Sequence, residues 1–218
     1  MKQLIGIRLV QFFLYEAQDI KVGKVCGIFG ANGSGKSSLL DAVQIVMLGA
    51  SAHRGHGVVF NAQADERKSS TRSIRAYCLG QYDVAEGARV RPDATTYITL
   101  VWQDTKTREL LSTGVCISAS SQRENHDVLG RYMLRSDLSL GDHLQLVDGE
   151  HRPRDWASFR EQLRQRCGPS DDPLYHDADR FVRALLLALR GDNGVAQLDA
   201  FRQAFRFGLK MGFDKSID

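Results

Sequence analysis

The chain has 218 residues, 43% hydrophobic content and a net charge of +3 at pH 7. This composition is typical of a globular protein with one substantial core, and so small a net charge does not by itself indicate nucleic-acid binding. No stretch approaches the roughly 18 consecutive apolar residues of a membrane span, and the first ten residues lack the apolar centre of a signal peptide. We therefore expect a cytoplasmic protein without a membrane partner.

Short apolar runs separated by turns predict strands in the first part of the chain. Leu4–Val10 is one predicted strand, and Val25–Phe29 is a continuous apolar run of the kind expected in a buried strand. Apolar residues at helical spacing from Leu39 to Met47 predict a helix that ends at Gly49.

The middle of the chain predicts a long polar loop followed by a strand pair. Residues 51–75 are polar and basic, and we expect them to lead into a helix near Ser73–Leu79. Tyr97–Trp102 and Leu110–Ser118 are rich in β-branched and aromatic residues and predict paired strands, the second interrupted at Gly114.

The last third predicts helices. Asp155 is expected to cap a helix that carries Trp156, Phe159 and Leu163. Two further apolar stripes at helical spacing follow, one from Phe181 to Leu189 closed by Gly191 and one from Leu198 to Leu209. The four cysteines form no CxxC pair and are expected to be free thiols, Cys26, Cys78, Cys116 and Cys167.

A phosphate-binding loop is the strongest motif in the chain. Residues 30–37 match G-x-x-x-x-G-K-[ST] in full, between an apolar run and an amphipathic helix. Glycines let backbone N–H groups approach phosphate oxygens, and a helix N-terminus favours the same anion. Lys36 is expected to reach the β- and γ-phosphates of ATP, Ser37 to bind Mg²⁺, and Ser38 to contact the α-phosphate side. The candidate ATP-binding residues are Gly30, Ala31, Asn32, Gly33, Ser34, Gly35, Lys36, Ser37 and Ser38.

Two later segments have a weak likeness to other ATPase motifs. Leu138–Asp142 is similar to an LSGGQ signature, and Leu144–Glu150 is similar to a Walker B strand with two acids. The two segments are almost adjacent, and Gly149 separates the acids, so a hairpin that turns at Asp148-Gly149 is the simpler interpretation. We therefore identify no catalytic base in the chain.

The order of these features resembles the N-terminal head region of MukB-like SMC ATPases, in particular the MksB/JetC/EptC branch of Wadjet and condensin-like complexes. The resemblance is strongest from Leu4 to Leu100, covers most of the chain and weakens after Arg135. The segments that carry it are Gly30–Gln44, Val59–Ala64, Arg67–Arg75, Tyr77–Gly80 and Thr96–Leu100.

The resemblance implies an α/β P-loop NTPase half-head of the ABC/SMC type, a mixed sheet around the phosphate-loop helix with a helical C-terminal part. Residues 1–150 would form the N-lobe of the head, and residues 151–218 would lead toward a coiled coil. The signature and Walker B motifs would lie in a separate C-terminal half. ATP turnover would then need that half and a second copy of the head, so this chain alone is expected to bind ATP and Mg²⁺ without turnover.

The resemblance also implies partners: DNA, a kleisin, small winged-helix (KITE) subunits and, in the plasmid-defence branch, a nuclease. The complex would be nucleoid-associated and would either condense chromosomes or restrict plasmids. Three alternatives stay open. They are a Rad50-like or RecN-like DNA-repair ATPase head, the nucleotide-binding subunit of an ABC transporter, and a fragment that only binds nucleotide.

The same resemblance suggests further site residues. Gln103 follows a predicted strand and is a candidate second Mg²⁺ ligand. The candidate DNA-binding cations, interspersed with hydroxyl side chains that suit phosphate contacts, are Arg54, Arg67, Lys68, Arg72 and Arg75. The aromatic residues Phe12, Phe13 and Tyr15 either stack on adenine or pack in the core, and core packing is the favoured interpretation.

Overall fold

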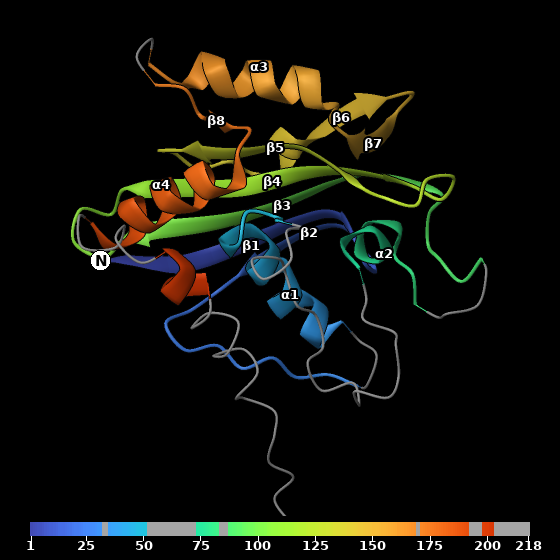
Figure 1. Ribbon diagram of the computed structural model, residues 1–218, viewed down its shortest axis with the longest axis horizontal. Coiled ribbons are helices and arrows are strands. Elements are labelled where there is room, and N and C mark those ends of the chain that lie inside the picture. The colour runs from blue at the N-terminus through green and yellow to red at the C-terminus, as the bar shows by residue number, and fades with distance from the viewer. Residues whose placement is uncertain (32–34, 52–72, 83–86, 169–170, 192–197, 203–218) are drawn as a thin grey trace, which may run out of the picture.

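A six-stranded sheet forms the centre of the computed structural model (Figure 1). The model describes residues 1–31, 35–51, 73–82, 87–168, 171–191 and 198–202. The strands lie in the order β2-β1-β3-β4-β5-β8. Their bounds are β1 (Lys2–Phe12), β2 (Tyr15–Lys21), β3 (Asp93–Asp104), β4 (Leu110–Ser120), β5 (Asp127–Leu134) and β8 (Leu174–Tyr175). Neighbouring strands of this described sheet are all antiparallel, so the expected mixed sheet is not found there.

Helices and a small hairpin cover the two faces of the sheet (Figure 1). The helices are α1 (Lys36–Met47), α2 (Ile74–Leu79), α3 (Trp156–Arg166) and α4 (Ala178–Arg190), with a short 3₁₀ turn η1 (Leu140–His143). The hairpin consists of β6 (Leu144–Val147) and β7 (Glu150–Pro153). In Figure 1, α3 and this hairpin lie above the sheet, whereas α1 and α2 lie below it.

Each face of the sheet has its own apolar core. The larger core contains side chains of β1, α1, α2 and α4, among them Phe181. The second contains Tyr97 of β3 together with Phe159 and Leu163 of α3. Residues after position 150 thus share both cores with the strands.

The predicted helix ends depend on local residue types and are present in the structure. Ser73 accepts a hydrogen bond from the Ala76 N–H at the start of α2, and Asp155 accepts one from the Ser158 N–H at the start of α3. Gly49 follows α1 with φ of 64°, a left-handed conformation that glycine adopts without strain.

The strand β4 passes through Gly114 without interruption, contrary to the sequence-based expectation. Gly114 is paired with Thr99 of β3 and with Tyr132 of β5. A Cβ atom at this position would lie 2.5 Å from the main-chain oxygen of Ile98 and 2.5 Å from the Tyr132 ring. The glycine therefore allows close packing inside the sheet instead of ending the strand.

The apolar run Val25–Phe29 is not the buried strand that its composition predicts. It has no regular secondary structure, and Val25 and Phe29 are 92% and 93% exposed. The chain leaves the sheet just before this run, since the Val22 N–H donates to the Ile5 carbonyl and β2 is an edge strand. A buried strand needs neighbouring strands or helices on its faces, and within the described residues no strand pairs with this run.

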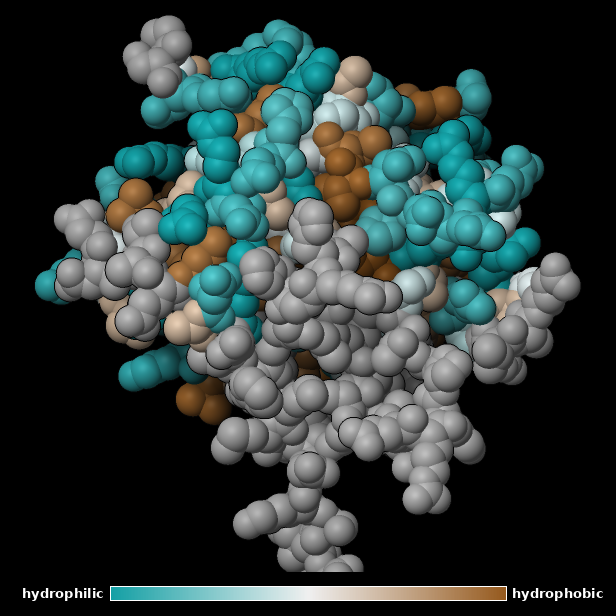
Figure 2. All heavy atoms as spheres, viewed as in Figure 1, coloured by the Kyte–Doolittle hydropathy of each residue, from teal (hydrophilic) through white to brown (hydrophobic). Residues whose placement is uncertain are grey.

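Some predicted elements fall partly outside the described residues. Of the stripe from Leu198 to Leu209, residues 198–202 are helical, and Leu198 is buried in the larger core. Phe205 and Leu209 lie outside the described part of the chain, as does most of the predicted loop at 51–75. On the face shown in Figure 2, small apolar areas are separated by hydrophilic side chains. Among the described residues, no helix has the length and hydropathy needed to cross a membrane.

A buried histidine links the sheet to the layer above it. His143 is 0% exposed, and its Nδ1 lies 2.8 Å from the Ser139 carbonyl oxygen. Because a carbonyl can only accept, Nδ1 carries the proton, and Nε2 accepts from the Thr99 hydroxyl at 2.7 Å. The Tyr132 hydroxyl lies 2.6 Å from the same Thr99 oxygen. Burial lowers the pKa of His143 to about 4.

This histidine predicts a loss of stability in mild acid. An unfolded histidine has a pKa of about 6.5, so between that pH and about pH 4 the unfolded chain binds one more proton than the folded chain. The free energy of unfolding should fall by about 2–3 kcal/mol from pH 7 to pH 4.5 through this group. The test is urea unfolding of the wild type and of His143→Asn at both pH values. The variant should lack the part of the pH dependence that His143 contributes. An equal pH dependence in both proteins would contradict it.

Candidate nucleotide site

The phosphate loop leads directly into α1, as its sequence predicts. Gly35 is the residue before the helix, with φ of 90° and ψ of 8°, and no side chain caps the helix N-terminus. The N–H groups of the first helical turn are therefore available to an anion. Asn32, Gly33 and Ser34 lie outside the described residues.

Lys36 spans the two ends of the loop. Its ammonium nitrogen lies 2.7 Å from the Gly30 carbonyl oxygen and 2.7 Å from that of Ala31. The side chain thus extends from the first turn of α1 back to the beginning of the loop. A cation at the beginning of the loop can bind an anion that the helix N-terminus attracts.

The two serines after Lys36 differ in exposure. Ser37 is exposed, so its hydroxyl is accessible to a metal ion. Ser38 is 1% exposed, and its hydroxyl has no hydrogen-bond partner among the described groups. A buried hydroxyl without a partner is costly. The buried Ser38 hydroxyl is therefore suited to contact with a polar ligand. Together, Lys36, Ser37 and Ser38 suit a Mg²⁺–nucleotide, with Ser37 as the metal ligand.

The three aromatic residues before the loop all pack on the larger core, and one of them also reaches the loop. Phe12 and Phe13 are buried and pack on Tyr77, with ring centroids 5.0 and 5.8 Å apart. This is the packing that the sequence favoured for them. Tyr15 is partly buried against the same core and also approaches the loop, where its hydroxyl oxygen lies 3.5 Å from the Gly35 carbonyl oxygen. Burial raises the pKa of Tyr15 above its ordinary value.

The structure does not bring Gln103 to the loop. Gln103 is paired with Gln3 at the start of β1, whereas Tyr15 is paired with Phe12 at the end of β1. At about 3.3 Å per residue, these two ends of β1 are about 30 Å apart. The Gln103 amide nitrogen instead donates to the Arg108 carbonyl within its own turn. Ser37 is thus the proposed metal ligand that the structure places at the loop.

Of the candidate DNA-binding cations, Arg75 is the one described. Its guanidinium donates to the main-chain oxygens of Ser120 and Ser121, each at 3.1 Å, and ties α2 to the end of β4. This half-buried side chain thus has a structural task. The other four candidates lie outside the described residues, namely Arg54, Arg67, Lys68 and Arg72.

The two segments with a weak likeness to signature and Walker B motifs have local structural roles. Ser139 and Asp142 form a reciprocal cap on η1. Asp148 and Gly149, with φ of 52° and 81°, form the turn of the β6–β7 hairpin, as predicted. Asp148 is exposed on the hairpin, and Figure 1 shows this hairpin on the opposite face of the sheet from α1. The sheet therefore separates these acids from Lys36.

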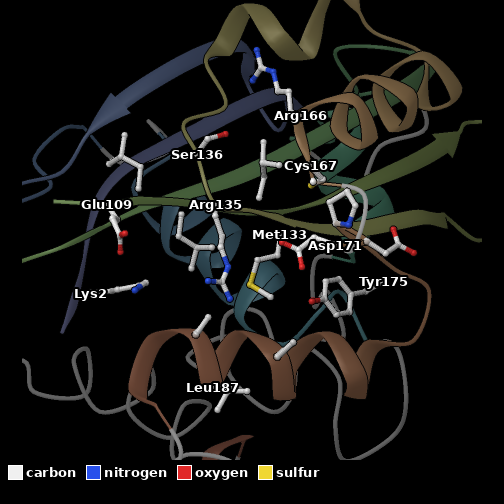
Figure 3. Close-up of a pocket in the computed structure, with 18 of the residues that line it drawn as sticks. Lys2, Glu109, Met133, Arg135, Ser136, Arg166, Cys167, Asp171, Tyr175 and Leu187 are labelled. Atoms are coloured by element: carbon white, nitrogen blue, oxygen red, sulfur yellow. The ribbon is translucent and has the colours of Figure 1, made fainter. Parts of the chain in front are cut away.

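A cavity of about 740 Å³ lies away from the phosphate loop, between α4 and the ends of β4 and β5 (Figure 3). In Figure 3, Lys2 and Arg135 extend into the same space above α4. Lys2 begins β1, so the cavity lies at the end of the sheet remote from Tyr15 and the phosphate loop. Acidic side chains, Glu109, Asp171 and Asp172, line it together with these cations. Neither charge prevails, so the lining does not indicate one class of ligand.

Two buried arginines that the sequence did not signal connect the segments around α1 and α2. Arg91 donates to the carbonyl oxygens of Phe13 and Cys78. Arg131 donates to the carbonyl oxygens of Gly49 and His176, and thereby ties the end of α1 to the segment before α4. These contacts join residues far apart in the chain, and no local motif signals them.

A family model described as the P-loop containing region of an AAA domain matches residues 4–67. No curated protein matches the sequence. The matched range contains most of β1, all of β2, the loop and α1. With the sheet and its helices, it establishes an α/β fold of the P-loop NTPase type. The loop indicates nucleotide binding, for which Mg²⁺ is the usual companion ion.

Proposed function

We propose that the chain is the N-terminal half of the ATP-binding head of an SMC-like, DNA-organising ATPase. ATP binding would drive engagement of two heads, this engagement would be coupled to DNA binding, and hydrolysis would release the heads. The observation that carries the proposal is the phosphate loop at the start of α1, preceded by an exposed apolar run.

The exposed run supports an incomplete head. In a P-loop domain the segment before the loop is an apolar strand. Here Val25 and Phe29 are almost fully exposed and Ile28 is 38% exposed. Exposed apolar groups of this size favour a covering partner. The missing half of a split head would supply neighbouring strands, and the edge strand β2 lies directly before the run.

The position of the acids supports the same proposal. Asp148 and Glu150 belong to the hairpin on the opposite face of the sheet, and Glu150 is paired with Arg152 at 3.2 Å. A general base must lie within hydrogen-bond reach of the attacking water. We therefore propose that the glutamate that activates this water comes from the C-terminal half, and that the signature loop comes from a second copy of the head.

The wider assembly rests on the resemblance to MukB-like proteins. We propose a kleisin, KITE subunits and DNA as partners, a nuclease in the plasmid-defence case, and a cytoplasmic, nucleoid-associated location. Whether the complex condenses chromosomes or restricts plasmids depends on those partners. A Rad50-like or RecN-like head would use the same loop.

The proposal predicts ATP binding with negligible turnover by this chain alone. Phosphate release under saturating Mg²⁺–ATP should stay at background. Asp148→Asn should leave both binding and turnover unchanged, because the β6–β7 hairpin that carries Asp148 lies across the sheet from α1, which begins at Lys36. Calorimetric titration with ATP checks the binding in the same preparations. Robust turnover that Asp148→Asn abolishes would reassign this hairpin as the catalytic acid and overturn the split-head proposal.

A further inference from the structure

The turn between β1 and β2 is held rigidly beside α2. Arg91 is 7% exposed, and its guanidinium donates to the carbonyl oxygens of Phe13 at 3.1 Å and Cys78 at 2.9 Å. The same guanidinium pairs with Glu16 at 2.9 Å. Buried groups with several charge-assisted hydrogen bonds have little freedom to move. The buried Arg91 therefore ties the chain before and after Tyr15 to the end of α2.

The same turn is joined to α1 through Tyr77. The Phe13 N–H donates to the Tyr77 carbonyl oxygen at 2.7 Å, and the Tyr77 ring stacks on Phe12. The Tyr77 hydroxyl donates to the Asp41 carboxylate in the second turn of α1. The turn and the phosphate-loop helix thus form one connected unit.

Tyr15 closes the space under the last glycine of the loop. A Cβ atom on Gly35 would lie 3.1 Å from the Tyr15 hydroxyl oxygen and 3.5 Å from the carbon that carries it. The Gly35 carbonyl oxygen, 3.5 Å from the same hydroxyl, also accepts the Leu39 N–H that begins the helix. A displacement of Gly35 would therefore change the direction of the first N–H groups of α1.

We propose that Tyr15 is a positioning residue of the nucleotide site. Its ring supports Gly35 from below, so that the first turn of α1 keeps its N–H groups directed at the phosphates. This inference rests on the proposed function, because it assumes that the loop binds a nucleotide. If Tyr15 supports the loop, it contributes to the affinity for the phosphate groups whatever the base is. If it stacked on adenine, it would contribute only to the affinity for ligands that carry a base.

The test compares three ligands that share phosphates but differ in the base. Binding of Mg²⁺ complexes of ATP, GTP and inorganic tripolyphosphate is measured by calorimetry with the wild-type chain and with Tyr15→Ala. We expect all three affinities to fall by about tenfold, the size of a lost helix-terminus interaction with an anion. Tyr15→Phe, which removes the hydroxyl but keeps the ring carbons near Gly35, should retain more affinity than Tyr15→Ala. Tyr82→Ala removes an exposed tyrosine outside the phosphate loop and serves as the matched control.

The outcomes separate this inference from the proposed function. Unchanged affinities in Tyr15→Ala would overturn the positioning role, as would a loss confined to ATP and GTP, which would assign Tyr15 to the base. A wild-type chain that binds none of the three ligands would overturn the nucleotide site itself. Tyr15 is half-buried and packs against the larger core, so the unfolding temperature of each variant is measured beside its affinities to establish that it is folded. Tyr15→Leu, which fills part of the same space, provides a second variant in which the three affinities should again fall together.

Discussion

Replacement of Lys36 with alanine should weaken ATP binding about 100-fold. The Lys36 ammonium lies at the opening of the loop, 2.7 Å from two main-chain oxygens at the beginning of the loop. A charge-assisted hydrogen bond contributes about 1.5–3 kcal/mol, and Lys36 is expected to make such bonds to two phosphates. Titration calorimetry with Mg²⁺–ATP measures the change directly. Lys36→Arg should not restore the affinity, because the planar guanidinium differs from an ammonium in shape and length.

A matched lysine and a stability measurement make this test specific. Lys24 is exposed in the segment before the loop, and Lys24→Ala should bind ATP like the wild type. Among the described residues, the Lys36 ammonium is bonded to the main-chain oxygens of Gly30 and Ala31, so its loss should change the free energy of unfolding by no more than about 1 kcal/mol. Equal ATP affinity in the Lys36 and Lys24 variants would exclude this loop as the phosphate site.

Features that depend on a few adjacent residues could be predicted from the sequence. The phosphate loop requires glycines, a lysine and a hydroxyl at fixed positions, and α1 begins at Lys36, directly after the last of these glycines. The cap at Asp155 and the turn at Asp148-Gly149 follow from the hydrogen-bonding and conformational preferences of single residues. None of these features needs information from a distant part of the chain.

Features that depend on distant contacts could not be predicted. The apolar composition of Val25–Phe29 indicates burial, but whether the run is buried depends on which strands lie beside it. The position of Gln103 followed from the pairing of β1 with β3, which no local pattern specifies. The buried network around His143 joins two strands to η1 across the second core. Its members are ordinary polar residues in the sequence.

Gly114 also has a role that local sequence does not reveal and that distant contacts determine. Its substitution should have the largest effect on stability. A strand interior disfavours glycine, so the sequence alone suggests a break. In the sheet, a methyl group at this position would meet the Ile98 main-chain oxygen and the Tyr132 ring, both at 2.5 Å. Main chain in a central strand cannot yield without loss of its hydrogen bonds. Gly114→Ala should therefore lower the free energy of unfolding by about 3 kcal/mol.

Thermal unfolding and a pair of controls test this expectation. A loss of this size corresponds to a fall of about 6–12 °C in unfolding temperature for a chain of this length. Gly168→Ala should be neutral, because among the described residues no atom beyond its chain neighbours lies within 4 Å of the added methyl group. Addition of Tyr132→Phe to Gly114→Ala should not restore stability, since the Ile98 oxygen would remain in place. If Gly114→Ala unfolded at the same temperature as Gly168→Ala, the close approach of β3, β4 and β5 at this point would be wrong.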